Sequence, residues 1–373
     1  MATKLQHPNS SKGISVEYLN NLIAEVDPSI HVEEVTVIGS KTYGEIFVST
    51  AGRLILQVRY SADSPAGLPQ QLVLKITRAV ERTSEPFFLE PFYRNEVNFY
   101  KYIRPELNLE TARCFGAGFD TESGFFAILL EDLTLRGAEF LNVTKPVALD
   151  TLRSLLATQA KLHARFWESP RLEPGGDLSW VDNAVDGPVA HLNMVVATPI
   201  IQNEIETVQH KRELLQRLRT SGPWLRAGTL ALSRHQAKLP RTLTEGDMHI
   251  GNTYRLPDGT GGLIDWQLMA RDHHMHDVNY LITTALSIED RRNHEKELLR
   301  FYLDRLGQEG GFSPPTLQAT WPEYCRSLQW GFYIGWLTTP VLSYGWEINV
   351  MNTLRLATAY EDHAVGELIA AIM

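Results

Sequence analysis

Residues 245–267, EGDMHIGNTYRLPDGTGGLIDWQ, place Asp247, Asn252 and Asp265, three side chains with oxygen atoms, around a glycine-rich turn. Two short apolar strands are expected on either side of the turn PDGTG at 257–261. In an antiparallel hairpin, residues equidistant from the turn face each other, so a symmetric hairpin would place Asn252 opposite Asp265. Asp247 lies on the loop that leads into the hairpin, five residues before Asn252. The three side chains can therefore converge on one point.

A hard cation with oxygen ligands would suit such a cluster of carboxylate and amide oxygens. The alternative is that Asp and Asn simply flank and cap the turn, as they do in many loops. Asp265 argues against that alternative, because it lies within the apolar stretch Leu263-Ile-Asp-Trp266. A carboxylate in such surroundings needs a partner.

Composition limits the classes of function. The chain has 373 residues, of which 43% are hydrophobic and 21% charged, which is enough for a large core in two domains or lobes. A net charge of −9 gives no electrostatic footprint for nucleic acid. Cys114 and Cys325 have no metal-type spacing and fit a reducing compartment. The N-terminus lacks the apolar core of a secretory signal, and the uncharged run 330–344 is too short to span a bilayer. We therefore expect a cytoplasmic monomer or homodimer with no membrane or nucleic-acid partner.

The hydrophobic pattern changes character along the chain. Strands are expected at residues 34–38, 45–49, 53–60, 71–76 and 125–130. One helix is expected near 91–103, and helical periodicity dominates from about residue 146 onward, except at the hairpin. This order predicts an α+β protein with a flexible tail at 1–15, a sheet-rich lobe at 16–133 and a larger helical lobe at 134–373.

Two charged residues lie at positions that are otherwise apolar. Lys75 interrupts the strand Leu72–Ile76, where a charge is unfavourable unless it is paired. Glu96 falls on the same face of the expected helix as Phe92 and Phe99. An ion pair between Lys75 and Glu96 is therefore expected. The alternative is that each side chain reaches solvent separately.

The order of these residues suggests a kinase. Protein kinases use a strand lysine, held by a helix glutamate, for the nucleotide phosphates. They then use an aspartate and an asparagine five residues apart, followed by a second metal-binding aspartate. Lys75 with Glu96, Asp247 with Asn252, and finally Asp265 occur in that order.

A candidate phosphate-binding loop precedes them. The segment GSKTYG, with Gly39, Ser40 and Gly44, lies between two expected strands. Backbone amides in such a turn can reach a phosphate. Two glycines in a turn are equally compatible with an ordinary hairpin.

Several motifs resemble those of one phosphotransferase superfamily. GDMHIGN at 246–252, followed by IDWQ at 264–267, resembles the signature of aminoglycoside and choline kinase-like phosphotransferases. Further motifs are most similar to the ecdysteroid-kinase-like branch: VLK at 73–75, Glu96 with Phe99-Tyr100, LLEDL at 129–133, LHARFW at 162–167 and DVNYL at 277–281. The resemblance runs from about residue 35 to 345.

The resemblance implies a two-lobed protein-kinase-like fold, with an N-terminal antiparallel β-sheet lobe that carries one key helix and a larger, mainly helical C-terminal lobe. It also implies ATP- and Mg²⁺-dependent transfer of the γ-phosphate to a hydroxyl of a small molecule. Asp247 would be the catalytic base, and Asn252 and Asp265 would hold the metal. The segment that contains Glu131 and Leu133 would hold the adenine through its backbone.

One position departs from the family pattern. The family usually has His-Gly-Asp, and this chain has Glu245-Gly246-Asp247. A third carboxylate near the metal could change base strength or metal affinity, because like charges raise each other's pKa. A catalytically degenerate module that only binds nucleotide is therefore an alternative.

Histidines cluster in DHHMHD at 272–277. A transition-metal site, as in a metallohydrolase, is one interpretation, but three histidines within four residues do not easily face one metal. Contact with substrate or a surface loop is favoured for His273 and His274, and Glu245 and His249 are further candidates for the substrate site. His163 is expected to be a hydrogen-bonded core histidine, and Asp277 to anchor the catalytic loop.

The acceptor is suggested only by the aromatic residues near the C-terminus. They are Trp321, Trp330, Phe332, Tyr333, Trp336, Tyr344 and Trp346. Most are expected in the core, but some could line a cleft for an apolar or aromatic alcohol. An aminoglycoside would instead require clustered carboxylates, and this region has only scattered ones such as Glu323 and Glu347. An aminoglycoside or choline-type kinase is the alternative.

Overall fold

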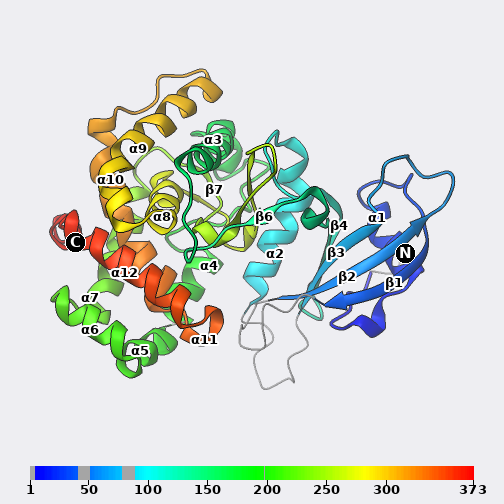
Figure 1. Cartoon of the computed structure of the whole chain (residues 1–373), viewed down its shortest axis with the longest axis horizontal. Helices are drawn as coiled ribbons and strands as arrows, with labels where there is room; N and C mark the ends of the chain where they lie inside the picture. Colours follow the sequence, from blue (N-terminus) through cyan, green and yellow to red (C-terminus); the bar gives the residue numbers. More distant parts are fainter. Residues whose placement is uncertain (1–4, 41–50, 78–88, 197) are drawn as a thin grey trace. The chain divides into compact units, whose positions relative to one another are not determined.

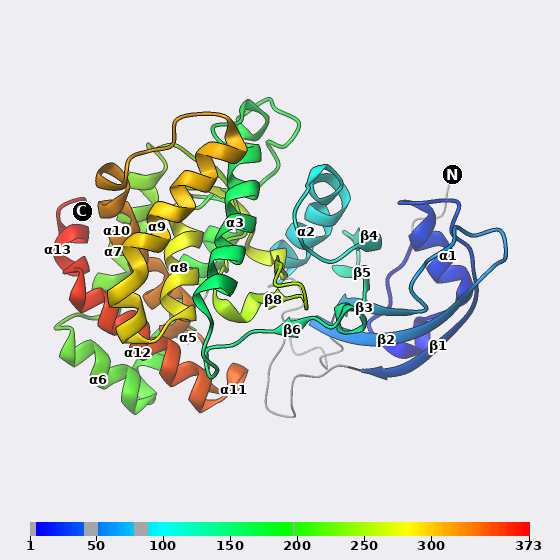
Figure 2. The ribbon, with the colours of Figure 1, turned by 45° about the horizontal axis from the view of Figure 1, so that its top comes forward.

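The computed structural model describes residues 5–40, 51–77, 89–196 and 198–373. The chain forms two compact units, one of Met1–Leu107 with Thr111–Ala138 and the other of Asn108–Glu110 with Glu139–Met373. Figures 1 and 2 show a sheet in the N-terminal unit and mostly helices in the C-terminal unit, so the predicted α+β class is confirmed. The expected strand at 45–49 lies outside the described residues. The functional lobe boundaries and the flexible tail stay predictions.

The N-terminal unit is built on an antiparallel sheet. Its strands are β1 (Val32–Ser40), β2 (Ala51–Tyr60), β3 (Gln71–Thr77), β4 (Cys114–Asp120) and β5 (Phe125–Glu131), in the order β1-β2-β3-β5-β4. Strand β3 lies in the middle, and its Lys75 pairs with Arg53 of β2 and Ile128 of β5. Central placement removes this lysine from water.

The two faces of this sheet have different neighbours. Leu72, Leu74 and Ile76 of β3 are buried in one apolar cluster with residues of α1 (Val16–Ala24). Because side chains alternate along a strand, Lys75 projects from the opposite face. The expected helix near 91–103 is α2 (Glu90–Asn98), which continues as a π-helical turn, η2 (Phe99–Ile103).

The C-terminal unit is mainly helical. Its longer helices are α3 (Leu149–Phe166), α5 (Thr198–Thr207), α6 (Gln209–Arg217), α7 (Gly222–Gln236), α8 (Met275–Ala285), α9 (Ile288–Gly310), α10 (Leu317–Trp330) and α12 (Trp346–Asp362). The unit also contains three short helices, α4 (Pro188–His191), α11 (Val341–Tyr344) and α13 (Val365–Ala370), and two π-helical segments, η6 (Leu192–Val196) and η9 (Gly331–Leu337). Every residue of α8 is buried, and α8 contacts α3, α9 and α10 (Figure 1). Among the described residues, no helix combines the length and apolarity needed to cross a membrane.

Two small sheets carry the loops between these helices. Strands β6 (Glu139–Phe140), β8 (Thr253–Arg255) and β9 (Gly261–Leu263) form one antiparallel sheet, and β7 (Thr242–Thr244) pairs with β10 (Ala270–Asp272) in the other. The predicted hairpin is therefore present as β8 and β9.

The predicted register of that hairpin is wrong by one residue. Thr253 pairs with Leu263, and the amide of Ile264 donates to the carbonyl of Asn252 at 3.0 Å, so Asn252 faces Ile264 rather than Asp265. The loop between the strands holds an odd number of residues, with Gly259 at φ +89°, and this shifts the pairing. Asp265 follows the strand in a left-handed conformation, with φ 68° and ψ 68°.

A buried ion-pair network joins α9 to α12. The Arg291 guanidinium donates to Glu295 at 2.9 Å and contacts Asp362 and, at 3.1 Å, His363. Burial would raise the pKa of Glu295, but the hydrogen bond from His363 and the charge of Arg291 hold it below its usual value. Arg292, whose side chain is 53% exposed, forms an ion pair with the same Asp362 carboxylate.

Replacing Arg291 by alanine should lower the free energy of unfolding by about 3–5 kcal/mol, because Glu295 then stays buried with less compensation. The matched variant Arg292→Ala should lower it far less, because that ion pair is exposed to solvent. Urea unfolding of the full chain measures both values. Equal losses in the two variants would show that the buried network does not stabilise this part of the fold.

Candidate active site

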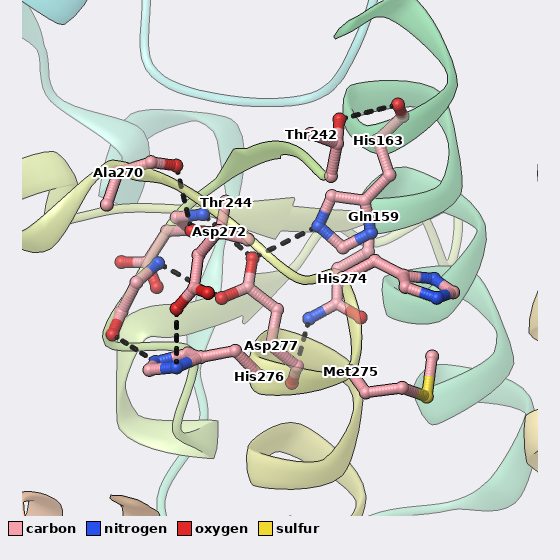
Figure 3. Close-up of polar contacts among 12 residues, drawn as sticks. Gln159, His163, Thr242, Thr244, Ala270, Asp272, His274, Met275, His276 and Asp277 are labelled. Atoms are coloured by element: carbon pink, nitrogen blue, oxygen red, sulfur yellow. Dashed lines mark hydrogen bonds and ion pairs between the residues drawn. The ribbon is translucent and has the colours of Figure 1, made fainter. Parts of the chain in front are cut away.

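The loop that carries Asp247 is held by one buried carboxylate. Asp277, in the first turn of α8, accepts from the backbone amide of Glu245 at 2.7 Å and from that of Gly246 at 3.0 Å. Figure 3 shows the same side chain next to His163, whose Nε2 donates to it at 3.2 Å. Asp277 is fully buried. The prediction that it anchors the loop is confirmed.

Glycine is the only residue type that fits at position 246 of this anchored turn. Its φ is +90°, a region in which side chains are strained. A Cβ built at this position would lie 1.9 Å from the carbonyl oxygen of Leu268. Any side chain at 246 would therefore push the loop away from Asp277.

His276 holds the carbonyl of Gly246, whose amide is held by Asp277. Its Nε2 donates to the carbonyl of Gly246 at 2.8 Å, and its Nδ1 lies 3.3 Å from Asp272 (Figure 3). Burial alone would lower the pKa of His276, but the hydrogen bond and charge of Asp272 outweigh it and raise the pKa to about 9. The imidazolium form donates from both nitrogens, as this position requires. This role of His276 was not predicted from the sequence, although the i,i+4 spacing of Asp272 and His276 was a signal for it.

His163, His273 and His274 each have a hydrogen-bond partner within the fold. His163 is buried and bonds the Tyr302 hydroxyl at 2.7 Å, so the expected core histidine is confirmed. His274 contacts the same hydroxyl at 3.0 Å, and Nδ1 of His273 accepts from the amide of Met275 at 3.3 Å.

The expected surface loop at 272–277 is wrong, because β10 ends and α8 begins here inside the core, with His273 and His274 buried. Among the described residues, no group of three or more His, Cys, Asp or Glu side chains is placed to hold a metal ion. Contact of these two histidines with substrate stays a prediction.

The structure brings Asp247, Asn252 and Asp265 together. The Asn252 side-chain amide donates to the backbone carbonyl of Asp247 at 2.9 Å. Burial, followed by the charge of Asp265, raises the pKa of Asp247 to about 8. The Asp247 side chain nevertheless keeps 28% of its surface exposed, so it remains reachable from solvent. The convergence predicted from the hairpin holds in spite of the shifted register, because the left-handed Asp265 leaves the strand at this point.

Glu245 adds a further carboxylate to this group. It is fully buried, and its Oε2 accepts from the amide of Asp247 at 2.9 Å. Oε1 has no hydrogen-bond partner among the described residues. Burial raises the pKa of Glu245 well above its usual value, and the charges of Asp277, Asp247 and Asp265 raise it further. Glu245 thus braces the loop through the amide of Asp247, and its surroundings favour the protonated form of its carboxyl group.

These oxygen donors fit a magnesium ion. Mg²⁺ is usually held by one or two carboxylates together with phosphate oxygens of the substrate. Asp265 and Asn252 supply a carboxylate and an amide oxygen on neighbouring backbone. Burial is the first cause of the raised pKa of Asp247 and the charge of Asp265 is the second, and a cation would offset the repulsion between the two carboxylates.

The N-terminal unit contains the predicted ion pair. Nζ of Lys75 donates to Oε2 of Glu96 at 2.6 Å, and only 5% and 2% of the two side chains are exposed. Strand β3 and helix α2 supply the two partners. The alternative, in which each side chain reaches solvent separately, is wrong because both are buried on the same face of the sheet.

The remaining predicted residues lie at strand ends. Gly39 and Ser40 end β1, opposite Ile55 and Leu54, whereas Gly44 lies outside the described residues. Glu131 ends β5, and its carboxylate accepts from the amide of Arg113 at 2.8 Å. Leu133 is buried and begins a short 3₁₀ turn capped by Asp132. Their roles toward a nucleotide stay predictions.

The fold and this arrangement of residues define a kinase-like protein. The family model for the ecdysteroid kinase-like family matches residues 43–310, and the chain therefore belongs to that family.

Solved structures of small-molecule kinases are also similar. A choline kinase from Streptococcus pneumoniae has 14% identity and a TM-score of 0.46, with 93% of this chain and 98% of that chain covered. A GDP complex of an aminoglycoside 2′-phosphotransferase has 12% identity and a TM-score of 0.49, with 94% and 98% covered. An ethanolamine kinase from Plasmodium vivax has 12% identity and a TM-score of 0.49, with 90% and 83% covered. A search of curated proteins gave no match.

Glu245→Gln should change how stability depends on pH. The folded chain keeps the Glu245 proton to higher pH than the unfolded chain does, so stability falls as the pH rises above the usual glutamate pKa. Glutamine cannot titrate, so the free energy of unfolding of the Glu245→Gln variant should increase relative to that of wild type between about pH 5 and about pH 8. Urea unfolding at both pH values, without divalent cations, measures this. A parallel pH dependence in the two proteins would show that Glu245 is ionised in the fold.

Proposed function

We propose that the protein is an ATP- and Mg²⁺-dependent small-molecule kinase that transfers the γ-phosphate to a hydroxyl of an apolar or aromatic alcohol. One observation carries this proposal: Asp247 is fixed beside Asp265 and Asn252 by a buried carboxylate, in a member of a kinase-like family. A reactive carboxylate next to a metal-binding set is the arrangement that phosphoryl transfer needs.

Asp247 is the residue proposed to act on the acceptor. It would accept the proton of the acceptor hydroxyl as the hydroxyl oxygen attacks the γ-phosphorus. A general base works best when its pKa lies near the working pH, and the pKa of Asp247 is raised to about 8. Its backbone is held through Glu245 and Asn252, so little reorganisation is needed.

Asn252 and Asp265 are the residues proposed to hold magnesium. When bound, the metal would neutralise negative charge on the phosphates. Asp265 is half-buried and sits in a left-handed turn at the end of β9, a strained backbone position of the kind found at functional sites. The turn aims the side chain away from the direction that the strand would give it.

The N-terminal unit is proposed to bind the nucleotide. Lys75, fixed by Glu96, would contact phosphate oxygens as a point charge. The backbone from Glu131 to Leu133 would receive the adenine, and the segment from Gly39 to Gly44 would cover the phosphates. The support for this part is the buried ion pair together with the family match.

The acceptor class rests on the surroundings of Asp247. The ring of His249 lies next to Trp336 and Tyr344, at centroid distances of 5.5 Å and 6.1 Å. Trp336 is buried, whereas 39% of Tyr344 is exposed, so the aromatic cluster reaches the surface there. An apolar or aromatic compound would be held against such a wall.

Two other acceptor classes and a non-catalytic module are alternatives to this function, and each predicts different observations. A polycationic aminoglycoside would need free carboxylates, but Glu323 is engaged by His235 and Arg326. A choline-type cation could use the aromatic wall instead. A degenerate nucleotide-binding module would retain Mg·ATP binding without turnover, and it is motivated by Glu245.

The two aspartates should respond differently to mutation. Asp265→Asn removes a metal ligand, so both Mg·ATP binding and turnover should weaken. Asp247→Asn leaves the metal ligands in place, so it should bind Mg·ATP nearly as well as wild type but turn over at least ~10²-fold more slowly. Calorimetric titration with Mg·ATP, together with steady-state ADP release, separates the two effects. Equal loss of nucleotide binding in both variants would make Asp247 a metal ligand instead.

Lys75→Met should weaken Mg·ATP binding by about 10- to 100-fold, the size expected for a hydrogen bond between charged groups. The matched control is Lys101→Met, because Lys101 forms an ion pair with Glu25 in the same unit but is partly exposed. Calorimetry measures both dissociation constants, and thermal unfolding checks that each variant is folded. Near-normal binding by a folded Lys75→Met protein would contradict the assignment of β3 to the nucleotide.

A further inference from the structure

His249 is locked in one orientation beside Asp247. It caps the 3₁₀ turn η7 (Ile250–Asn252), with its Nδ1 accepting from the amide of Gly251 at 3.0 Å. A Cβ at Gly251 would lie 2.7–2.8 Å from the ring, so the glycine is needed for this close contact. Tyr280 and Trp336 pack edge-to-face on the ring, at 5.9 Å and 5.5 Å between centroids. The imidazole therefore has little freedom to turn.

The cap also determines which nitrogen carries the proton. A ring nitrogen that accepts a hydrogen bond carries no hydrogen, so the imidazole of His249 is neutral and has one donor and one acceptor. Because Nδ1 is the acceptor for Gly251, the hydrogen is on Nε2. Nε2 lies 3.9 Å from Oδ2 of Asp247, which is too far for a direct hydrogen bond. Within the described ranges of the chain, no side chain or carbonyl accepts from it at hydrogen-bond distance.

We infer that His249 contacts the acceptor: its Nε2–H donates to the oxygen of the acceptor hydroxyl while that hydroxyl donates to Asp247. An oxygen atom can lie about 2.7–3.0 Å from both groups, because their separation of 3.9 Å is shorter than two hydrogen bonds in line. This inference rests on the proposed function and adds a second contact to the reacting atom.

The pair of groups selects the chemistry of the acceptor. A hydroxyl has one donor and two acceptor lone pairs, so it satisfies Asp247 and His249 together. An ammonium group has three donors and no acceptor, and it would leave its hydrogens facing the Nε2–H. The site therefore discriminates an alcohol from the corresponding amine, through a neutral donor supported by an aromatic wall.

The chemical step balances without a change at His249. The hydroxyl oxygen forms a bond to the γ-phosphorus as the bond from that phosphorus to the β–γ bridging oxygen breaks, which releases ADP. The hydroxyl proton goes to Asp247. His249 keeps its proton throughout and contributes position only.

Two substitutions separate the donor from the cap. Asparagine at 249 can still accept from the amide of Gly251, because asparagine is a preferred capping residue, but its amide nitrogen is too short to reach the Nε2 position. Glutamine is longer, so its amide nitrogen can occupy the Nε2 position. His249→Asn therefore removes the donor and keeps the cap, and His249→Gln keeps a donor at the reacting oxygen.

The experiment measures acceptor-dependent ADP release by the full chain with Mg·ATP and neutral hydroxylated compounds. For the best alcohol, His249→Asn should lower kcat/KM by about tenfold or more, with Mg·ATP affinity from calorimetry unchanged. His249→Gln should recover most of that loss. The primary amine that corresponds to the same alcohol should be a much poorer acceptor for wild type, and the preference should shrink in His249→Asn.

Three results would overturn the inference. One is an unchanged kcat/KM in a folded His249→Asn protein. The second is an equal loss in His249→Gln and His249→Asn with Mg·ATP affinity intact, because a restored donor would then have no effect and the ring would act through its packing alone. The third is an alcohol preference that is the same in all three proteins. Absence of acceptor-dependent ADP release from wild type would instead contradict the proposed function itself, and the inference with it.

Discussion

The two hydrogen bonds from the backbone amides of Glu245 and Gly246 to the Asp277 carboxylate determine the geometry of the candidate active site. They join the loop before β8 to the fully buried helix α8. His276 completes the attachment by donating to the carbonyl of Gly246, so both the amide and the carbonyl of this residue are held. Every proposed role of Asp247 depends on this rigid attachment, because phosphoryl transfer relies on position and electrostatics more than on covalent chemistry by the protein.

Negative charge is concentrated around the loop that these hydrogen bonds hold. Glu245 and Asp247 both have raised pKa values, first because of burial and then because of neighbouring carboxylates. Such a cluster is unfavourable by itself, and a bound cation with phosphate oxygens would relieve it. The replacement of the usual family histidine by Glu245 is compatible with an intact loop, because its Oε2 still accepts from the amide of Asp247.

The sequence predicted the elements that depend on local pattern and on a few long-range charge pairs. The alternation of apolar residues predicted strand β3. An unpaired charge in an apolar segment is unfavourable, and this predicted the ion pair of Lys75 with Glu96. The register of the hairpin could not be predicted, because the loop conformation at Gly259 decides whether an odd or an even number of residues separates the strands. The burial of His273 and His274 was also missed, because it depends on tertiary contacts such as that of His274 with Tyr302, which is distant in the sequence.

The central claim is that this chain transfers a phosphate to an alcohol rather than only binding a nucleotide. Phosphorus NMR of the wild-type chain incubated with Mg·ATP and a panel of neutral hydroxylated compounds tests it most directly. We expect a new phosphate-monoester resonance for at least one alcohol, with an equal amount of ADP formed and no such resonance without the acceptor. Mg·ATP binding with no phosphate ester from any acceptor, including the aminoglycoside and choline classes, would contradict it.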